Sequence, residues 1–116
     1  MITSIAFTAF SVTNMARSKE FYENVLGLKI GHNFKDKWVE YSLANSTFAI
    51  TTTDIGHRPG AKGAVIAFEV KNLDSFVKTL KDKSVTFIAE PFPTPVCRMA
   101  VIQDPDGNEI TIHQRH

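Results

Sequence analysis

Three residues in the second half of the sequence have side chains that could move protons or orient a ligand. Glu109 and His113 stand four residues apart in the last predicted strand, where polar and apolar residues alternate. Because side chains along a strand point alternately to its two faces, Glu109, Thr111 and His113 would share one face. Glu69, on an earlier predicted strand, could join them in acid–base chemistry. A solvent-exposed strand end explains the same residues, and the pattern favours that simpler interpretation.

The remaining reactive side chains fit structural roles. Cys97, the only cysteine, has no base or helix start beside it in the sequence that would turn it into a thiolate, so we interpret it as a passive thiol. Asp104 and Asp106 belong to the segment 104–108, Asp-Pro-Asp-Gly-Asn, which predicts a tight hairpin turn. The turn accounts for both carboxylates without a catalytic pair.

The elements that must position these residues follow from hydrophobic periodicity. Residues 2–12 predict a strand, and Asn14 is placed to cap a helix that ends at Gly27. Asn72 is placed in the same way before a second helix, whose apolar face extends to Leu80. The other predicted strands are 28–34, 38–43, 47–53, 64–70, 85–89, 98–103 and 109–113.

The two halves of the sequence follow the same order of elements. A shift of 58 residues aligns Ala6 with Ala64, Phe10 with Phe68, Val12 with Val70 and Asn14 with Asn72. The matches fall on the strand and the helix cap together, and each half is predicted to be β-α-β-β-β. The sequence therefore indicates an internal duplication.

Composition limits the classes of function. A chain of 116 residues with 43% hydrophobic residues predicts one soluble globular domain with a substantial core. A net charge of +1 provides no broad electrostatic surface for nucleic acid or an anionic membrane. No apolar run is long enough to span a bilayer, and no positive charge of a secretory signal precedes Arg17. We expect a cytoplasmic protein that acts on a small molecule.

Two motifs resemble those of a known family. Residues 14–28 (Asn-Met-Ala-Arg-Ser-Lys-Glu-Phe-Tyr-Glu-Asn-Val-Leu-Gly-Leu) and residues 104–110 (Asp-Pro-Asp-Gly-Asn-Glu-Ile) resemble the opening helix and the late turn of the vicinal oxygen chelate superfamily, also called the glyoxalase/bleomycin resistance/extradiol dioxygenase superfamily. The resemblance implies an α+β fold in which two tandem βαβββ modules form curved mixed sheets around a shared cavity. We expect a single domain, 1–116, with module one at 1–56, a linker at 57–62 and module two at 63–116.

The resemblance also implies a metal site and a homodimer. Members with metal hold a divalent ion in the cavity through side chains of the first and last strands of each module. In this sequence, those positions correspond to Phe7, Thr51, Val65 and Thr111. None is a histidine or a carboxylate, the ligands that zinc, nickel, manganese or iron would need. We therefore expect no metal cofactor, unless a divalent ion binds through non-standard ligands.

Aromatic residues indicate another use for the cavity. Phe7 occupies a ligand position, and Phe34, Trp38 and Phe92 lie in segments that could border the cavity. Aromatic rings at such positions suit a dry pocket that encloses an apolar or planar ligand. Alternatively, Phe7 fills a degenerate cavity or packs in a dimer contact.

These observations leave three classes of function. The leading prediction is a metal-free protein that binds a small organic ligand in an apolar cavity lined by Phe7, Trp38, Thr51, Val65, Glu69 and Thr111. The alternative is a lyase, isomerase or dioxygenase with displaced metal ligands, or with metal-independent acid–base chemistry at Glu69, Glu109 or His113. The third is a non-catalytic interaction module. Bleomycin itself is cationic and fits a chain of net charge +1 poorly.

Overall fold

Two asparagines open the two main helices with nearly the same backbone geometry. The side-chain oxygen of Asn14 (φ −139°, ψ 104°) accepts a hydrogen bond from the Arg17 amide at 3.0 Å. That of Asn72 (φ −136°, ψ 101°) accepts one from the Ser75 amide at 3.0 Å. Each bond satisfies an amide that the first helical turn leaves without an intrahelical partner. Both predicted caps are confirmed, and their likeness supports the internal duplication.

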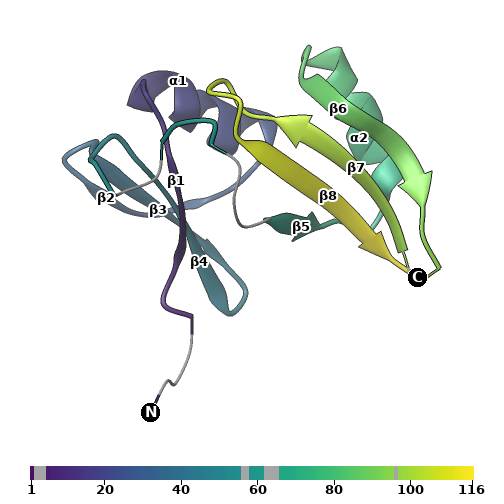
Figure 1. Ribbon diagram of the computed structural model, residues 1–116, viewed down its shortest axis with the longest axis horizontal. Helices are drawn as coiled ribbons and strands as arrows, with labels where there is room; N and C mark the ends of the chain where they lie inside the picture. Colours follow the sequence, from purple (N-terminus) through teal and green to yellow (C-terminus); the bar gives the residue numbers. More distant parts are fainter. Residues whose placement is uncertain (2–4, 56–57, 62–65, 96) are drawn as a thin grey trace. The chain divides into compact units, whose positions relative to one another are not determined.

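The computed structural model describes residues 1, 5–55, 58–61, 66–95 and 97–116, and the chain divides into two compact units, Met1–Gly60 and Ala61–His116. The first unit contains a mixed sheet in the order β1-β4-β3-β2, with β1 parallel to β4 and the other pairs antiparallel. Its elements are β1 (Thr8–Ser11), α1 (Met15–Lys19), the π-helical segment η1 (Glu20–Val25), β2 (Ile30–Phe34), β3 (Trp38–Leu43) and β4 (Ser46–Thr51) (Figure 1).

The second unit has the same topology. Its sheet has the order β5-β8-β7-β6, with β5 parallel to β8 and the other pairs antiparallel. Its elements are β5 (Ala67–Glu69), α2 (Leu73–Asp82), β6 (Thr86–Pro93), β7 (Cys97–Gln103) and β8 (Glu109–Arg115). Two mixed four-stranded sheets, each with a βαβββ order, confirm the predicted α+β fold with tandem modules. The single domain, the linker at 57–62 and the shared cavity stay predictions.

Some element boundaries differ from those predicted. The first strand starts at Thr8 rather than at residue 2, and residues 2–4 lie outside the described part of the chain. Pairing with its parallel partner β4 begins at Thr8, which stands opposite Phe48. The strand predicted at 85–89 continues to Pro93: β6 is a sheet edge, where prolines are tolerated, and its register shift between Ala89 and Phe92 spans Pro91.

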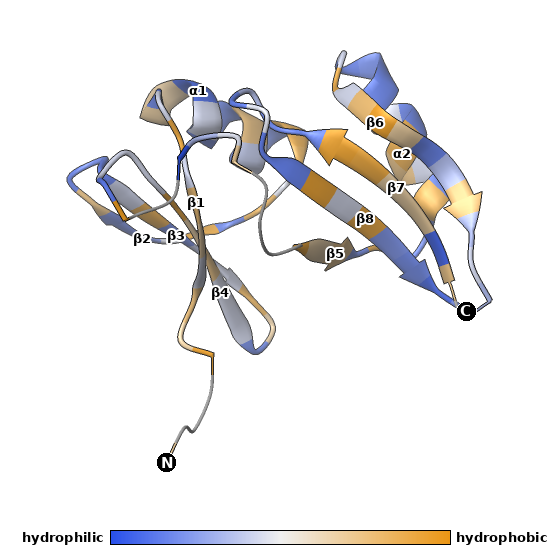
Figure 2. Ribbon diagram, in the orientation of Figure 1, coloured by the Kyte–Doolittle hydropathy of each residue, from blue (hydrophilic) through white to orange (hydrophobic). Residues whose placement is uncertain are grey.

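The core of each unit lies between its sheet and its helix. In the second unit, α2 contacts β6, β7 and β8, and Leu73 and Leu80 of the helix and Ile102 and Ile110 of the sheet are fully buried. Figure 2 shows the alternation along β8, where apolar residues are flanked by hydrophilic ones. Cys97 of β7 is buried. Within the described residues, no helix is long and apolar enough to cross a membrane.

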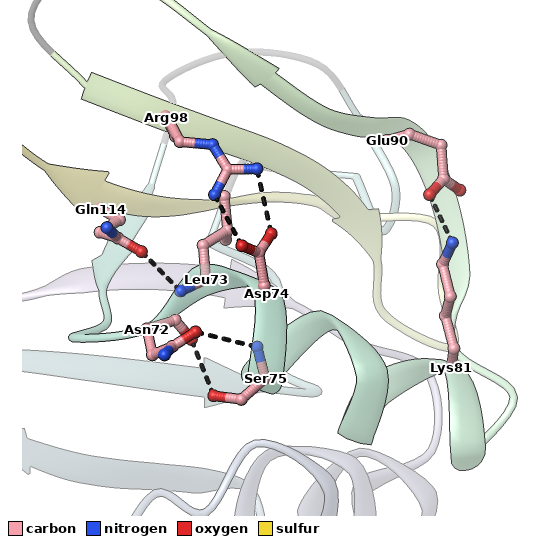
Figure 3. A network of polar contacts seen from close by, with 8 residues as sticks. All are labelled: Asn72, Leu73, Asp74, Ser75, Lys81, Glu90, Arg98 and Gln114. Atoms are coloured by element: carbon pink, nitrogen blue, oxygen red, sulfur yellow. Dashed lines mark hydrogen bonds and ion pairs between the residues drawn. The ribbon is translucent and has the colours of Figure 1, made fainter.

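Polar contacts fix the start of α2 on the sheet (Figure 3). The Gln114 side chain of β8 accepts a hydrogen bond from the Leu73 amide at 2.6 Å. Arg98 of β7 forms two parallel hydrogen bonds to the Asp74 carboxylate, at 3.0 and 3.1 Å. Bidentate pairs of this kind add directional specificity. The helix is therefore held in register with the strands that carry the candidate site residues of this unit.

The predicted turn at 104–108 is confirmed. The Asp104 side chain accepts hydrogen bonds from the amides of Asp106 and Asn108, at 2.9 and 2.8 Å, and Gly107 has a φ of 85°. A positive φ costs glycine nothing. The carboxylate of Asp104 thus serves the hairpin, as the sequence indicated.

Loss of either helix cap should lower stability by a similar amount. We expect Asn14→Ala and Asn72→Ala each to reduce the free energy of unfolding by about 1 kcal/mol, because an amide loses its acceptor. Asn72→Ser, which restores an N-cap acceptor, should recover most of the loss. Urea denaturation measures all three. Full stability in Asn72→Ala would contradict the capping role.

Candidate functional site

The sheet of the first unit has one face turned to the helix and one turned away. Tyr41 and Phe48, paired across β3 and β4, contact the Tyr22 ring of η1 at centroid distances of 6.2 and 5.1 Å. Because side chains alternate along a strand, Trp38 and Glu40 point to the opposite face. We call this the aromatic face, defined by Phe7, Phe34, Trp38, Glu40, Ala49 and Thr51.

Phe7 and Trp38 meet on the aromatic face. Their rings lie edge to face, with centroids 5.0 Å apart and planes at 89°. The strand between them, β4, presents the small side chain of Ala49 on this face, which leaves room for the two rings. Trp38 is half-buried and Phe7 is 49% exposed, so the pair offers an aromatic surface to solvent. Edge-to-face pairs of this kind are favourable beyond the area that they bury.

Thr51 lies on the same face, but its hydroxyl is used by the protein. The fully buried Oγ1 donates to the Lys37 carbonyl at 2.7 Å and lies 2.6 Å from the Thr53 hydroxyl. It also accepts a hydrogen bond from the Thr53 amide at 3.0 Å. These hydrogen bonds join the end of β4 to Lys37, the residue before β3, and to Thr53. The residue supports the aromatic face rather than offering a ligand atom.

Glu40 holds the Trp38 ring in place. Its Oε2 accepts a hydrogen bond from the indole Nε1 at 2.8 Å, and the side chain is half-buried on β3, an inner strand of the sheet. Glu40 is not among the site residues predicted from the sequence. The signal was available, since Glu40 lies two positions after Trp38 on an alternating strand and so must share its face.

In the second unit, Glu69 and His113 form a close pair. They stand opposite each other where β5 runs parallel to β8, and Glu69 Oε1 lies 2.6 Å from His113 Nδ1. Glu69 Oε2 accepts a hydrogen bond from the Arg115 amide at 2.9 Å. The Arg115 amide and then the His113 side chain hold the pKa of Glu69 below its ordinary value. Glu69 is therefore an anion that orients the imidazole through Nδ1.

The other predicted residues of this unit do not join the pair. Glu109 pairs with Gln103 at the opposite end of β8, so its carboxylate is about four strand positions, roughly 13 Å, from His113. Thr111 stands between them, buried, opposite Ala67. Val65 lies outside the described residues. Of the three acid–base candidates, the fold thus brings two together.

The strand registers also define which positions of the two units correspond. Thr51 stands opposite Ser11, and His113 stands opposite Glu69, which is 58 residues after Ser11. The counterpart of Thr51 is therefore His113. Thr111, by the same reasoning, corresponds to Ala49, which stands opposite Ala9 as Thr111 stands opposite Ala67. Neither Ala49 nor Thr111 offers a carboxylate.

These residues do not fit a divalent metal. Phe7 has no donor atom, and the Thr51 hydroxyl is committed to its turn. Thr111 offers only a neutral hydroxyl, whereas protein metal sites rely on imidazole, thiolate or carboxylate ligands. Among the residues that the structure describes, no three His, Cys, Asp or Glu side chains gather as a ligand set.

The charge on Glu69 should make stability depend on pH. Because its folded pKa is lowered, the carboxylate stabilises the fold above the ordinary glutamate pKa, and this contribution disappears as the pH falls through the folded value. We expect Glu69→Gln to be less stable than the wild type at neutral pH, with the difference vanishing on acidification. Thermal unfolding across an acid series measures it. A difference that stays constant with pH would contradict the charge effect.

Comparisons with known proteins agree with this topology. A family model described as Glyoxalase/Bleomycin resistance protein/Dioxygenase superfamily matches residues 4–112. The antibiotic-binding protein TnmS3 from Streptomyces sp. CB03234 is 21% identical over 99% of this chain and 98% of its own, with a TM-score of 0.85. A glyoxalase/bleomycin resistance protein from the same organism is 22% identical over 96% and 100%, with a TM-score of 0.81.

A superfamily member from Sphaerobacter thermophilus DSM 20745 is 23% identical over 98% of both chains, with a TM-score of 0.84. No curated protein matches the sequence significantly. At these identities the solved structures show the fold alone, whereas the family model covers nearly the whole chain. The two βαβββ units and the matched sequence together place this chain in the glyoxalase/bleomycin resistance protein/dioxygenase superfamily.

Proposed function

We propose that this chain binds a small organic molecule with a planar or apolar surface on its aromatic face, without a metal ion. The Phe7–Trp38 pair carries the proposal. Two rings that pack edge to face present an aromatic surface, and Phe7 remains half exposed. A planar ligand would remove this surface from water and contact both rings, with little loss of side-chain freedom.

The side chains at the family's metal positions support a metal-free site. Phe7 puts apolar surface where a metal ligand would stand, and Thr51 turns its hydroxyl back into the protein. The similar structure of TnmS3, described as an antibiotic-binding protein, supports the class of ligand. The proposal includes a homodimer and a cytoplasmic location. Light scattering of the purified protein tests the dimer.

Trp38 provides the direct test of binding. It is the only tryptophan in the chain, so intrinsic fluorescence reports this face alone. Acridine, a neutral planar probe, should quench the emission saturably. Phe7→Ala should weaken binding about tenfold, because the ligand loses the contact of one ring. Ile30→Ala is the matched control, since Ile30 is similarly exposed but pairs with Tyr41 on the helix-facing side.

Removal of divalent ions tests the other half of the proposal. Dialysis against a chelator should leave the acridine affinity and the thermal midpoint unchanged. Elemental analysis of the purified protein should show no stoichiometric divalent ion. A stoichiometric ion, or loss of binding on chelation, would contradict the metal-free function. Equal affinities of wild type and Phe7→Ala would contradict the assigned face.

A second candidate function rests on the Glu69–His113 pair. A carboxylate that binds Nδ1 orients the imidazole and leaves Nε2 to take or give a proton, the arrangement of a general base. The side chain of His113 is 23% exposed, so a substrate proton could reach it. On this candidate the chain would be a metal-independent lyase or isomerase.

Chemical change of a bound ligand separates the two candidates. Any molecule that titrates Trp38 should be recovered by mass spectrometry and NMR with its structure unaltered, if the chain only binds. Time-dependent conversion that is lost in His113→Gln but kept in Glu109→Gln would favour the enzyme. Glu109 is the matched control, because it lies on the same strand face but far from His113.

A further inference from the structure

Glu40 is the carboxylate of the aromatic face. It lies half-buried on an inner strand, beside the Trp38 ring, Ala49 and His32. Of the described residues, none forms an ion pair with it. In contrast, Asp36 pairs with Lys19 at 3.4 Å and Asp74 with Arg98 at 3.0 Å.

The aromatic face supplies no counter-charge of its own. The strand positions of β2, β3 and β4 that point to this face carry no lysine or arginine among the described residues, and the cross-strand partner of Glu40 is His32. A carboxylate that is partly withdrawn from water without a cation costs free energy. The Trp38 indole N–H offsets part of this cost by donating to Oε2 and leaves the negative charge in place.

A negative charge beside two aromatic rings favours a cationic ligand. An organic cation is attracted to the face of a tryptophan or phenylalanine ring and to a carboxylate at the same time. Glu40 lies next to Trp38 by direct contact, and Trp38 touches Phe7. The overall charge of +1 provides no long-range attraction for a cation, so the discrimination has to arise from these contacts.

We propose that Glu40 makes the aromatic face selective for organic cations, in which a protonated amine or a quaternary ammonium group is attached to a planar ring system. This inference rests on the proposed function and names its class of ligand. The rings hold the planar part, and the carboxylate sets the sign of the charge that is accepted. Glu40 is thus a specificity-determining residue, while Phe7 and Trp38 supply the general affinity.

A matched series of probes tests the charge preference. At mildly alkaline pH, 9-aminoacridine is a cation, acridine is neutral and acridine-9-carboxylate is an anion, on one ring system. Quenching of Trp38 by each gives its affinity for the whole chain. We expect the cation to bind about tenfold more tightly than acridine, and the anion to bind more weakly than acridine.

Glu40→Gln isolates the charge from the geometry. The amide oxygen of glutamine still accepts from the indole Nε1, so the Trp38 ring keeps its orientation while the negative charge is removed. This variant should bind the three probes with similar affinities, and its emission spectrum and thermal midpoint without ligand should match the wild type. Glu20→Gln, on the helix side of the sheet, removes the same charge elsewhere and should keep the wild-type order of affinities.

The outcomes separate this inference from the function on which it rests. If wild type binds all three probes equally, or if the cation preference survives in Glu40→Gln, the charge selectivity is wrong and planar-ligand binding stands. If the preference is lost equally in Glu20→Gln, a general charge effect replaces the role of Glu40. If none of the three probes quenches Trp38 saturably, the proposed function and this inference both fail.

Discussion

The parallel hydrogen bonding between the first and last strand of each unit is the constraint on which both candidate sites depend. In the first unit the Val12 amide donates to the Thr51 carbonyl at 2.9 Å, and in the second the Val70 amide donates to the His113 carbonyl at 2.8 Å. A slip of one residue in such a pair would turn every side chain of the strand to the other face. The meeting of Glu69 with His113 follows from this register.

The two units share one backbone topology but have different side chains at corresponding positions. The helix caps at Asn14 and Asn72 and the order of strands in the sheet are the same in both units. Where the second unit has a carboxylate and an imidazole, the first has the buried Ser11 and Thr51. Backbone pairing does not depend on side-chain identity at these positions, so the two copies could diverge without loss of the fold. The first unit has an aromatic face, and the second has an ionisable pair.

Much of this could be predicted from the sequence, because the signals are local. Asparagine caps, alternation along strands and the turn at 104–108 depend on residues within a few positions of one another, and each was found where it was expected. The types of residue at the positions that the family resemblance assigns to metal ligands are also a property of the sequence, and Phe7 and Thr51 are poor ligands in any register. The strand ends were predicted less well, since an end depends on where backbone pairing with the partner strand stops, as β1 and β6 show.

The tertiary structure alone decided which side chains meet. Phe7 and Trp38 are 31 residues apart, and Glu69 and His113 are 44 apart, so their contacts depend on strand order and register rather than on local pattern. It also separated Glu109 from His113, which alternation had placed on one face but could not place at one end. By itself the sequence determined the duplicated βαβββ order and the absence of ordinary metal ligands at Phe7, Thr51, Val65 and Thr111. Long-range pairing decided the rest, because a contact between distant segments is fixed by their shared hydrogen bonds and not by either segment alone.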